Sequence, residues 1–230
     1  RHYEPHTSEE RGRGGQKLRL AHVFLKDCDL PLVDWQPRLS LPANDQKALA
    51  EQFGLPTDKM LIAIHTGRTW PVKELPAERW QEIVDELQKK WPCHILHFCS
   101  PSRDGGAVHT LQRVQTLPPD LPVTAIAAIL SQCRLFIGLD SGLLHLAGAV
   151  GIPVIGVFGP TNPRYFLPLN PPAQGISQAL PCSFCQHEPT VKHWVTGCPY
   201  AIRCMKEISA GQILEIANRV LDLPPNLYIR

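Results

Sequence analysis

An α/β fold built on a doubly wound parallel sheet is predicted by the alternation of short apolar runs with helical patterns along the chain. Residues 135–139 form a continuous apolar run, which is typical of a strand buried on both faces of a parallel sheet. Residues 141–150 then favour a helix, and Gly151-Ile-Pro153 ends it before a second apolar run at 154–158. Such a strand–helix–strand unit joins parallel strands. The buried face expected for its helix consists of Leu143, Leu146, Ala147 and Val150.

Further strands and helices are expected on both sides of this unit. Strands are expected at 61–65 and 95–99, where short apolar runs are followed by polar loops. Helix 77–90 has Trp80, Ile83, Val84 and Leu87 at helical spacing, and a weaker helix is expected at about 107–115. Three more helices are expected: one capped by Asn44 with Leu49 and Phe53 on one face and Gly54 at its end, one capped by Thr124 with a face that reaches Cys133, and one opened by the capping box of Ser209 and Gln212.

Composition limits the class of protein. The chain has 230 residues, of which 43% are apolar and 19% charged, so it can bury one good core. The formal net charge of +2 is too small to indicate a nucleic-acid partner. The sequence has no apolar run of about 18 residues and does not open with a signal-peptide pattern. We therefore expect a cytoplasmic protein.

Two regions are expected from these patterns. Residues 1–40 have no hydrophobic period and carry several prolines, so we expect an irregular tail and linker. Residues 41–230 are expected to form the sheet domain, with a segment at 182–204 that contains four cysteines. The other cysteines are scattered, and we expect them to behave as small core residues: Cys28, Cys93, Cys99 and Cys133.

The turn after residues 135–139 predicts an anion site. Asp140, Ser141 and Gly142 follow the strand and begin the next helix, where free amide groups and the helix dipole favour negative charge. Gly142 would let a ligand approach the backbone, and Ser141 can donate its hydroxyl. A diphosphate fits this chemistry. Asp140 could contact the ligand, or it could simply cap the helix.

The same stretch resembles the bacterial family-9 glycosyltransferases, which include the heptosyltransferases of lipopolysaccharide core assembly. In that family an Asp-(Ser/Thr)-Gly-x-x-His-Leu-Ala segment is followed by Gly-x-Pro and Phe-Gly-Pro-Thr. The matching positions here are Asp140–Gly142, His145–Ala147, Gly151, Pro153 and Phe158–Thr161. The resemblance covers about 41–222 and implies a Rossmann-like domain, the C-terminal half of a GT-B type glycosyltransferase. It also implies that residues 1–40 are the remnant of a missing N-terminal domain.

The resemblance implies an inverting transfer that needs no metal for catalysis. The donor would be a nucleotide-diphosphate sugar, ADP-heptose above all, and the acceptor a lipopolysaccharide core or a similar saccharide or lipid-linked molecule. The catalytic base would lie on the N-terminal domain, or on a partner chain that supplies it. The protein would be cytoplasmic or peripheral at the inner membrane. Two alternatives remain: a protein-directed heptosyltransferase with a structural metal, and a non-catalytic nucleotide-sugar-binding half of a split enzyme.

The resemblance also implies roles for individual residues. Asp140 would hydrogen-bond the donor sugar, and the amides of Ser141, Gly142 and Leu143 would hold phosphate. His145 would orient that loop. Lys73 would stabilise the leaving group, with Arg68 as the competing cation. Four further residues would border the donor: Thr66 and Gly67 near the phosphate or nucleoside, and Ser102 and Asp104 near the ribose or base. In the heptosyltransferases a Glu often serves in the last of these loops, and none stands between Cys99 and Pro119, so the donor's identity stays open.

The four clustered cysteines allow three interpretations. Cys182, Cys185, Cys198 and Cys204 could ligate zinc or iron, form disulfides, or remain inert thiols. Many family-9 members carry a similar set, and a protein-modifying branch binds iron through four cysteines. The resemblance therefore adds a structural zinc or iron to the candidates.

Overall fold

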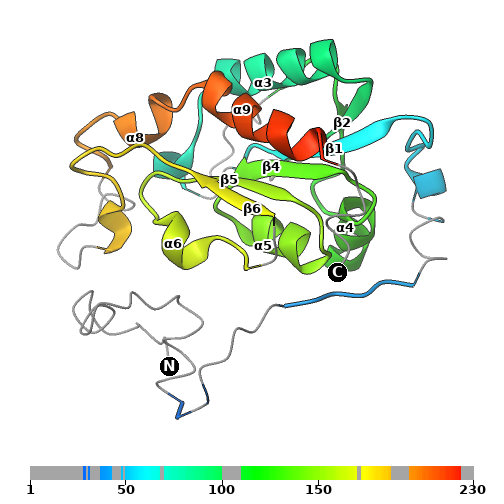
Figure 1. The fold of residues 1–230 in the computed structure, drawn as a ribbon, viewed down its shortest axis with the longest axis horizontal. Helices are drawn as coiled ribbons and strands as arrows, with labels where there is room; N and C mark the ends of the chain where they lie inside the picture. The colour runs from blue at the N-terminus through cyan, green and yellow to red at the C-terminus, as the bar shows by residue number, and fades with distance from the viewer. Residues whose placement is uncertain are drawn as a thin grey trace.

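A computed structural model describes residues 28–29, 31, 37–42, 48, 50–67, 70–99, 110–169, 172–187 and 197–223. Within these ranges six parallel strands form one sheet in the order β3-β2-β1-β4-β5-β6 (Figure 1). The strands are β1 (Met60–His65), β2 (Cys93–Phe98), β3 (Gln115–Thr116), β4 (Leu135–Leu139), β5 (Val154–Val157) and β6 (Ala173–Ile176). This is the Rossmann strand order, and it confirms the predicted fold.

Helices cover both faces of the sheet. The helices are α3 (Ala77–Lys90), α4 (Val123–Leu130), α5 (Gly142–Ala149), α6 (Pro163–Phe166), α8 (Arg203–Lys206) and α9 (Ala210–Leu221), with short 3-10 turns η1 (Pro71–Lys73) and η2 (Cys185–His187). In Figure 1 α3 and α9 lie on one face, and α4 and α5 lie on the other. Residues 50–52 are also helical, and Gly54 follows them with a φ of 59°. Asn44 and Leu49, which were expected in that helix, lie outside the described residues.

Two hydrophobic cores result from the alternation of side chains along the strands. Ile62 and Ile64 of β1 pack under α3 and α9, whereas Leu61 and Ala63 pack on the opposite face with α4 and α5. The predicted face of α3 is completely buried. The capping box of Ser209 and Gln212 is present at the start of α9. Periodicity and capping therefore located these helices correctly.

The buried face of α5 differs from the predicted one. Leu144, Ala147 and Gly148 are buried, whereas Leu143, Leu146 and Val150 are only partly buried. A Cβ on Gly148 would lie 2.7 Å from the Cβ of Pro168, so the helix packs closely against the segment that follows α6. Because α5 packs against this segment as well as against the sheet, its buried face is rotated away from the one that sequence spacing predicts.

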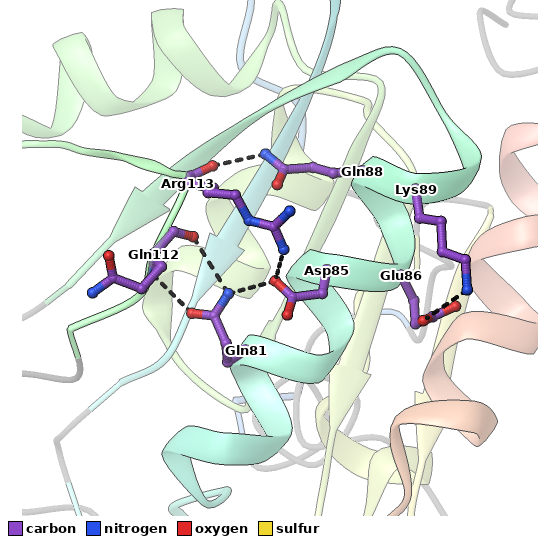
Figure 2. A network of polar contacts seen from close by, with 7 residues as sticks. All are labelled: Gln81, Asp85, Glu86, Gln88, Lys89, Gln112 and Arg113. Atoms are coloured by element: carbon purple, nitrogen blue, oxygen red, sulfur yellow. Dashed lines mark hydrogen bonds and ion pairs between the residues drawn. The ribbon is translucent and has the colours of Figure 1, made fainter.

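The prediction of a helix at about 107–115 is wrong for residues 110–115, the part of it that the structure describes. Residues 110–114 are not helical, and Gln115 begins β3. Figure 2 shows the reason: side chains of α3 hydrogen-bond to the backbone of this segment and hold it in a non-helical form. Gln81 Oε1 accepts from the Gln112 amide at 2.7 Å, Gln88 Nε2 donates to the Arg113 carbonyl at 2.7 Å, and Arg113 contacts Asp85. Tertiary contacts outweigh local propensity here.

Of the cysteines expected in the core, Cys93 and Cys133 are buried and Cys99 is partly buried, but Cys28 is exposed. The expectation is therefore wrong for Cys28, which precedes the sheet domain. No helix in the described part of the chain is long and apolar enough to cross a bilayer.

Two histidines lie inside this fold. His65, the last residue of β1, is 2% exposed, and His97 of β2 is completely buried. Burial, together with the nearby His97, lowers the pKa of the His65 imidazole to about 4. His65 is therefore neutral in the folded protein at neutral pH.

We expect the protein to lose stability as the pH falls from about 6.5 to about 4. In this window the unfolded chain protonates His65 while the folded chain does not, so acid favours unfolding. The shift corresponds to about 3 kcal/mol. Urea unfolding at several pH values measures this loss. His65→Asn, which cannot be protonated in this range, should lose less of its free energy of unfolding as the pH falls. An equal loss in both proteins would contradict the lowered pKa of His65.

Candidate functional site

The described residues that are predicted to bind the donor follow β1 and β4, where the strand order reverses. β1 and β4 are neighbours in the sheet, with His65 opposite Gly138, yet β1 leads to α3 on one face and β4 leads to α5 on the other. The two loops therefore leave the sheet in opposite directions. In open α/β sheets the carboxyl ends of two such strands are the usual place for a ligand.

The loop after β1 is shaped by Gly67. Its φ is 71°, a value that residues with a side chain rarely adopt. A Cβ at this position would lie 2.6 Å from the Cδ1 of Leu139. Pro71 then begins η1, and the Lys73 amide bonds to the Trp70 carbonyl at 2.9 Å. This tight turn brings the Lys73 side chain back towards β4.

Lys73 and Asp140 form an ion pair across the two loops. Lys73 Nζ lies 2.7 Å from Asp140 Oδ2 and 3.5 Å from the Asp140 carbonyl oxygen. The Lys73 side chain is 16% exposed and that of Asp140 is 8% exposed. Lys73 Nζ also lies 4.6 Å from the centre of the Trp70 ring, within the range of a cation–π contact. The sequence predicted both charged residues but not their contact, and it gave Trp70 no role.

The start of α5 is open to solvent. Ser141 caps the helix, and its Oγ accepts from the Leu144 amide at 3.5 Å. Gly142 is exposed, and a Cβ there would have no neighbour within 4 Å. Ser141 and Leu143 are partly exposed. The first amides of α5 have no partner within the helix, so this turn can receive an acceptor such as a phosphate oxygen.

His145 lies one turn further along α5 and is exposed. Neighbouring protein atoms still remove part of its hydration, which lowers the pKa of its imidazole; Asp140 raises that pKa and Lys73 lowers it. The histidine is thus close enough to the ion pair to feel both charges. Because its pKa falls below 6.5, it adds no fixed positive charge at neutral pH.

Thr66 differs from the other candidates because its side chain is completely buried. Its Oγ1 lies 3.0 Å from His97 Nε2, so the hydroxyl is used inside the protein and only the backbone could border a ligand.

His65 lies close to the start of α5: its Nδ1 is 3.2 Å from Ser141 Oγ. Sequence reasoning gave neither histidine a role, because both ended or lined apolar runs. Arg68, Ser102 and Asp104 lie outside the described residues and stay predictions.

The four clustered cysteines lie near one another at the loop after β5. The Phe184 amide bonds to the Gly159 carbonyl at 2.9 Å, and a Cβ on Gly159 would lie 2.9 Å from the Cys204 Sγ. Burial, together with the other three thiols, raises the pKa of the Cys204 thiol to about 11. All eight cysteines, each within the described residues, are free. In the same part of the chain no three His, Cys, Asp or Glu side chains are placed to hold a metal ion.

Known proteins share this sequence pattern and this fold. Lipopolysaccharide heptosyltransferase 1 of Pseudomonas aeruginosa is 27% identical over 170 residues, which cover 73% of this chain and 46% of that protein. The structure of E. coli ADP-heptose lps heptosyltransferase II matches with a TM-score of 0.65 at 18% identity, over 84% of this chain and 56% of that one. The iron-containing dodecameric glycosyltransferase TibC from enterotoxigenic E. coli H10407 matches with a TM-score of 0.60 at 18% identity, over 84% and 50%.

The chain spans about half the length of the curated relatives that it matches. The sequence pattern of one family matches residues 16–195 and so includes Lys73, Asp140 and the turn that begins α5. Because this match covers well over half of the chain, the protein belongs to glycosyltransferase family 9 (heptosyltransferase).

Proposed function

We propose that this chain binds the diphosphate and sugar of ADP-heptose and supplies the donor-binding half of a heptosyltransferase. The observation that carries the proposal is the Lys73–Asp140 pair beside the open start of α5. Family membership and the names of the relatives, which include an ADP-heptose lps heptosyltransferase, support the choice of sugar and nucleotide.

Lys73 is suited to stabilise the leaving group. As the glycosidic bond breaks, negative charge develops on the diphosphate, and a fixed cation nearby lowers the energy of that charge. The Lys73 ammonium is largely shielded from water, which strengthens its interaction with an anion. Asp140 and the Trp70 ring hold it in place before the donor arrives, so little reorganisation is needed.

Asp140 is suited to bind the sugar rather than the phosphates. Its carboxylate would repel a diphosphate, whereas it can accept hydrogen bonds from sugar hydroxyls. Among the described residues, Lys73 Nζ is the side-chain partner of Oδ2. Oδ1 can therefore accept from the donor while Oδ2 keeps Lys73 oriented.

The remaining parts of the reaction are proposed to lie elsewhere. Transfer to an acceptor needs a base that takes the proton of the attacking hydroxyl. Because relatives are about twice as long, we propose that the base and the acceptor site come from a second domain or a partner chain. The acceptor would be a lipopolysaccharide core or a similar lipid-linked saccharide, which would place the reaction at the cytoplasmic face of the inner membrane.

A structural iron or zinc is a second proposal, supported by the four neighbouring thiols and by the iron-containing relative. Thiolates suit either metal. The described arrangement is not a formed metal site, so binding would have to draw Cys182, Cys185, Cys198 and Cys204 together. Bound iron would favour the protein-directed alternative over a lipopolysaccharide acceptor.

We expect Lys73→Ala to weaken ADP binding roughly 10- to 100-fold, the range of a hydrogen bond to a charged group. Isothermal titration with ADP and ADP-heptose measures the loss. Lys89→Ala is the matched control: Lys89 also pairs with a carboxylate, Glu86, but on the outer surface of α3 (Figure 2). Unchanged ADP affinity in Lys73→Ala would contradict the proposal and transfer the role to Arg68.

Asp140→Ala should separate the binding of the sugar from the binding of the phosphates. We expect it to weaken ADP-heptose binding while ADP alone binds as tightly as before or more tightly, because the loss of a negative charge beside the phosphates outweighs the loss of one of the two contacts that orient Lys73. The same titrations measure both ligands. If ADP-heptose affinity stayed at the wild-type value, Asp140 would have no contact with the sugar.

If the cysteines bind a structural metal, we expect about one iron or zinc per chain after expression in metal-supplemented medium. Elemental analysis and thermal unfolding measure content and stability. Cys182→Ser with Cys185→Ser should lose both the metal and part of the stability. Cys28→Ser is the control, since Cys28 is exposed and outside the cluster. Wild-type protein that stays metal-free under these conditions would exclude the site.

A further inference from the structure

We propose that His65 is a positioning residue for the donor diphosphate, because its Nδ1–H donates to Ser141 Oγ and so turns the Ser141 hydroxyl hydrogen towards the ligand. This inference rests on the proposed function and adds a residue that touches no ligand itself. It concerns a buried side chain that sequence reasoning left without a role.

The location of His65 suits such a role. It ends β1 beneath the start of α5 and is 2% exposed. Its neighbour in the sheet is Gly138, where a Cβ would lie 3.1 Å from the His65 Cβ and 2.7 Å from the Phe136 ring. The glycine thus makes room for the imidazole. From this position His65 Nδ1 reaches Ser141 Oγ at 3.2 Å.

The hydrogen bonds of Ser141 allow two arrangements. A hydroxyl has one hydrogen and two lone pairs, and the Leu144 amide uses one lone pair at 3.5 Å. If His65 carries its proton on Nδ1, it donates to the second lone pair, and the Ser141 hydrogen is free for a ligand. If the proton is on Nε2, Nδ1 accepts the Ser141 hydrogen, and the serine has nothing left to donate to a phosphate.

The surroundings of Nε2 favour the first arrangement. This nitrogen is buried and has no hydrogen-bond partner among the residues that the structure describes. A buried N–H without an acceptor is rarer and more costly than a lone pair without a donor. The nearby His97 offers no acceptor through Nε2, which already contacts Thr66 Oγ1 at 3.0 Å. Since burial lowers the His65 pKa to about 4, the ring carries a single proton, and Nδ1 is its favoured position.

The consequence for the donor is a third hydrogen bond. A diphosphate oxygen only accepts, so it can use the Ser141 hydroxyl together with the free amides of Gly142 and Leu143. A serine whose hydrogen was held by His65 would instead present lone pairs to the negative oxygens. The tautomer of one buried histidine therefore decides whether the cap of α5 attracts or repels the ligand.

Nitrogen NMR of protein labelled with ¹⁵N-histidine tests the tautomer without a ligand. We expect His65 Nδ1 to be protonated and Nε2 unprotonated at pH 7, with the signals assigned by their loss in His65→Asn. A protonated Nε2 with an unprotonated Nδ1 would overturn the inference. The measurement uses the wild-type chain, so it does not depend on the stability of a variant.

Binding of ADP, with adenosine as the probe that lacks phosphate, tests the consequence. We expect His65→Leu and Ser141→Ala each to weaken ADP binding roughly 10-fold while adenosine binding is unchanged. The double variant should lose no more than either single one, because both remove the same interaction. His65→Asn, whose side-chain amide can donate from near the position of Nδ1, should recover much of the affinity.

The outcomes separate this inference from the proposed function. Wild-type protein that does not bind ADP would refute both. Wild-type binding with fully additive losses, or with no loss in a folded His65→Leu, would refute only the role of His65. His65→Gln provides a further check, since its amide reaches the Nε2 position instead, and it should not recover ADP binding.

Discussion

The ion pair of Lys73 and Asp140 connects two loops that the sheet sends to opposite faces. Withdrawing both charges from water is costly, and a partly buried pair is weak evidence of a contribution to stability. The pair lies where the strand order reverses, the usual place for a ligand, so a role in binding explains its presence better than a role in stability does. A cation held between a carboxylate and the Trp70 ring keeps one geometry, and an anion that arrives at the start of α5 finds it already oriented. The rest of the site is arranged around this fixed charge.

Much of the fold could be predicted because its signals are local. The run at 135–139, the helical period of α3 and the capping box at Ser209 each need only neighbouring residues, and all are present in the structure. The segment 110–116 could not be predicted in this way, since its conformation depends on hydrogen bonds to side chains of α3, which is distant in sequence. The edge strands β3 and β6 were missed because they are short and carry polar residues or glycine. An edge strand depends on the backbone of its neighbour more than on its own side chains.

In the candidate site, too, local features could be predicted from the sequence and contacts between distant residues could not. Asp140, Ser141 and Gly142 could be selected because they follow a strand and begin a helix, and the family resemblance that they carried is confirmed by the match over residues 16–195. Which atoms meet could not be predicted: the Lys73–Asp140 contact joins residues 67 positions apart. His65 was hidden for another reason. In sequence it ends an apolar strand, and only its distance to Ser141 and the lack of a partner for its Nε2 among the described residues indicate the role proposed for it.

Gly67 links the two loops by shape as well. A side chain on its Cα would overlap Leu139, the residue immediately before Asp140, so any enlargement at position 67 would press on the end of β4. Trimming the leucine would remove this overlap, but a side chain at a φ of 71° would still be strained. Position 67 should therefore remain glycine in relatives that keep this turn, whatever residue stands at position 139. The backbone that supports the carboxylate thus depends on the absence of a side chain two residues after β1.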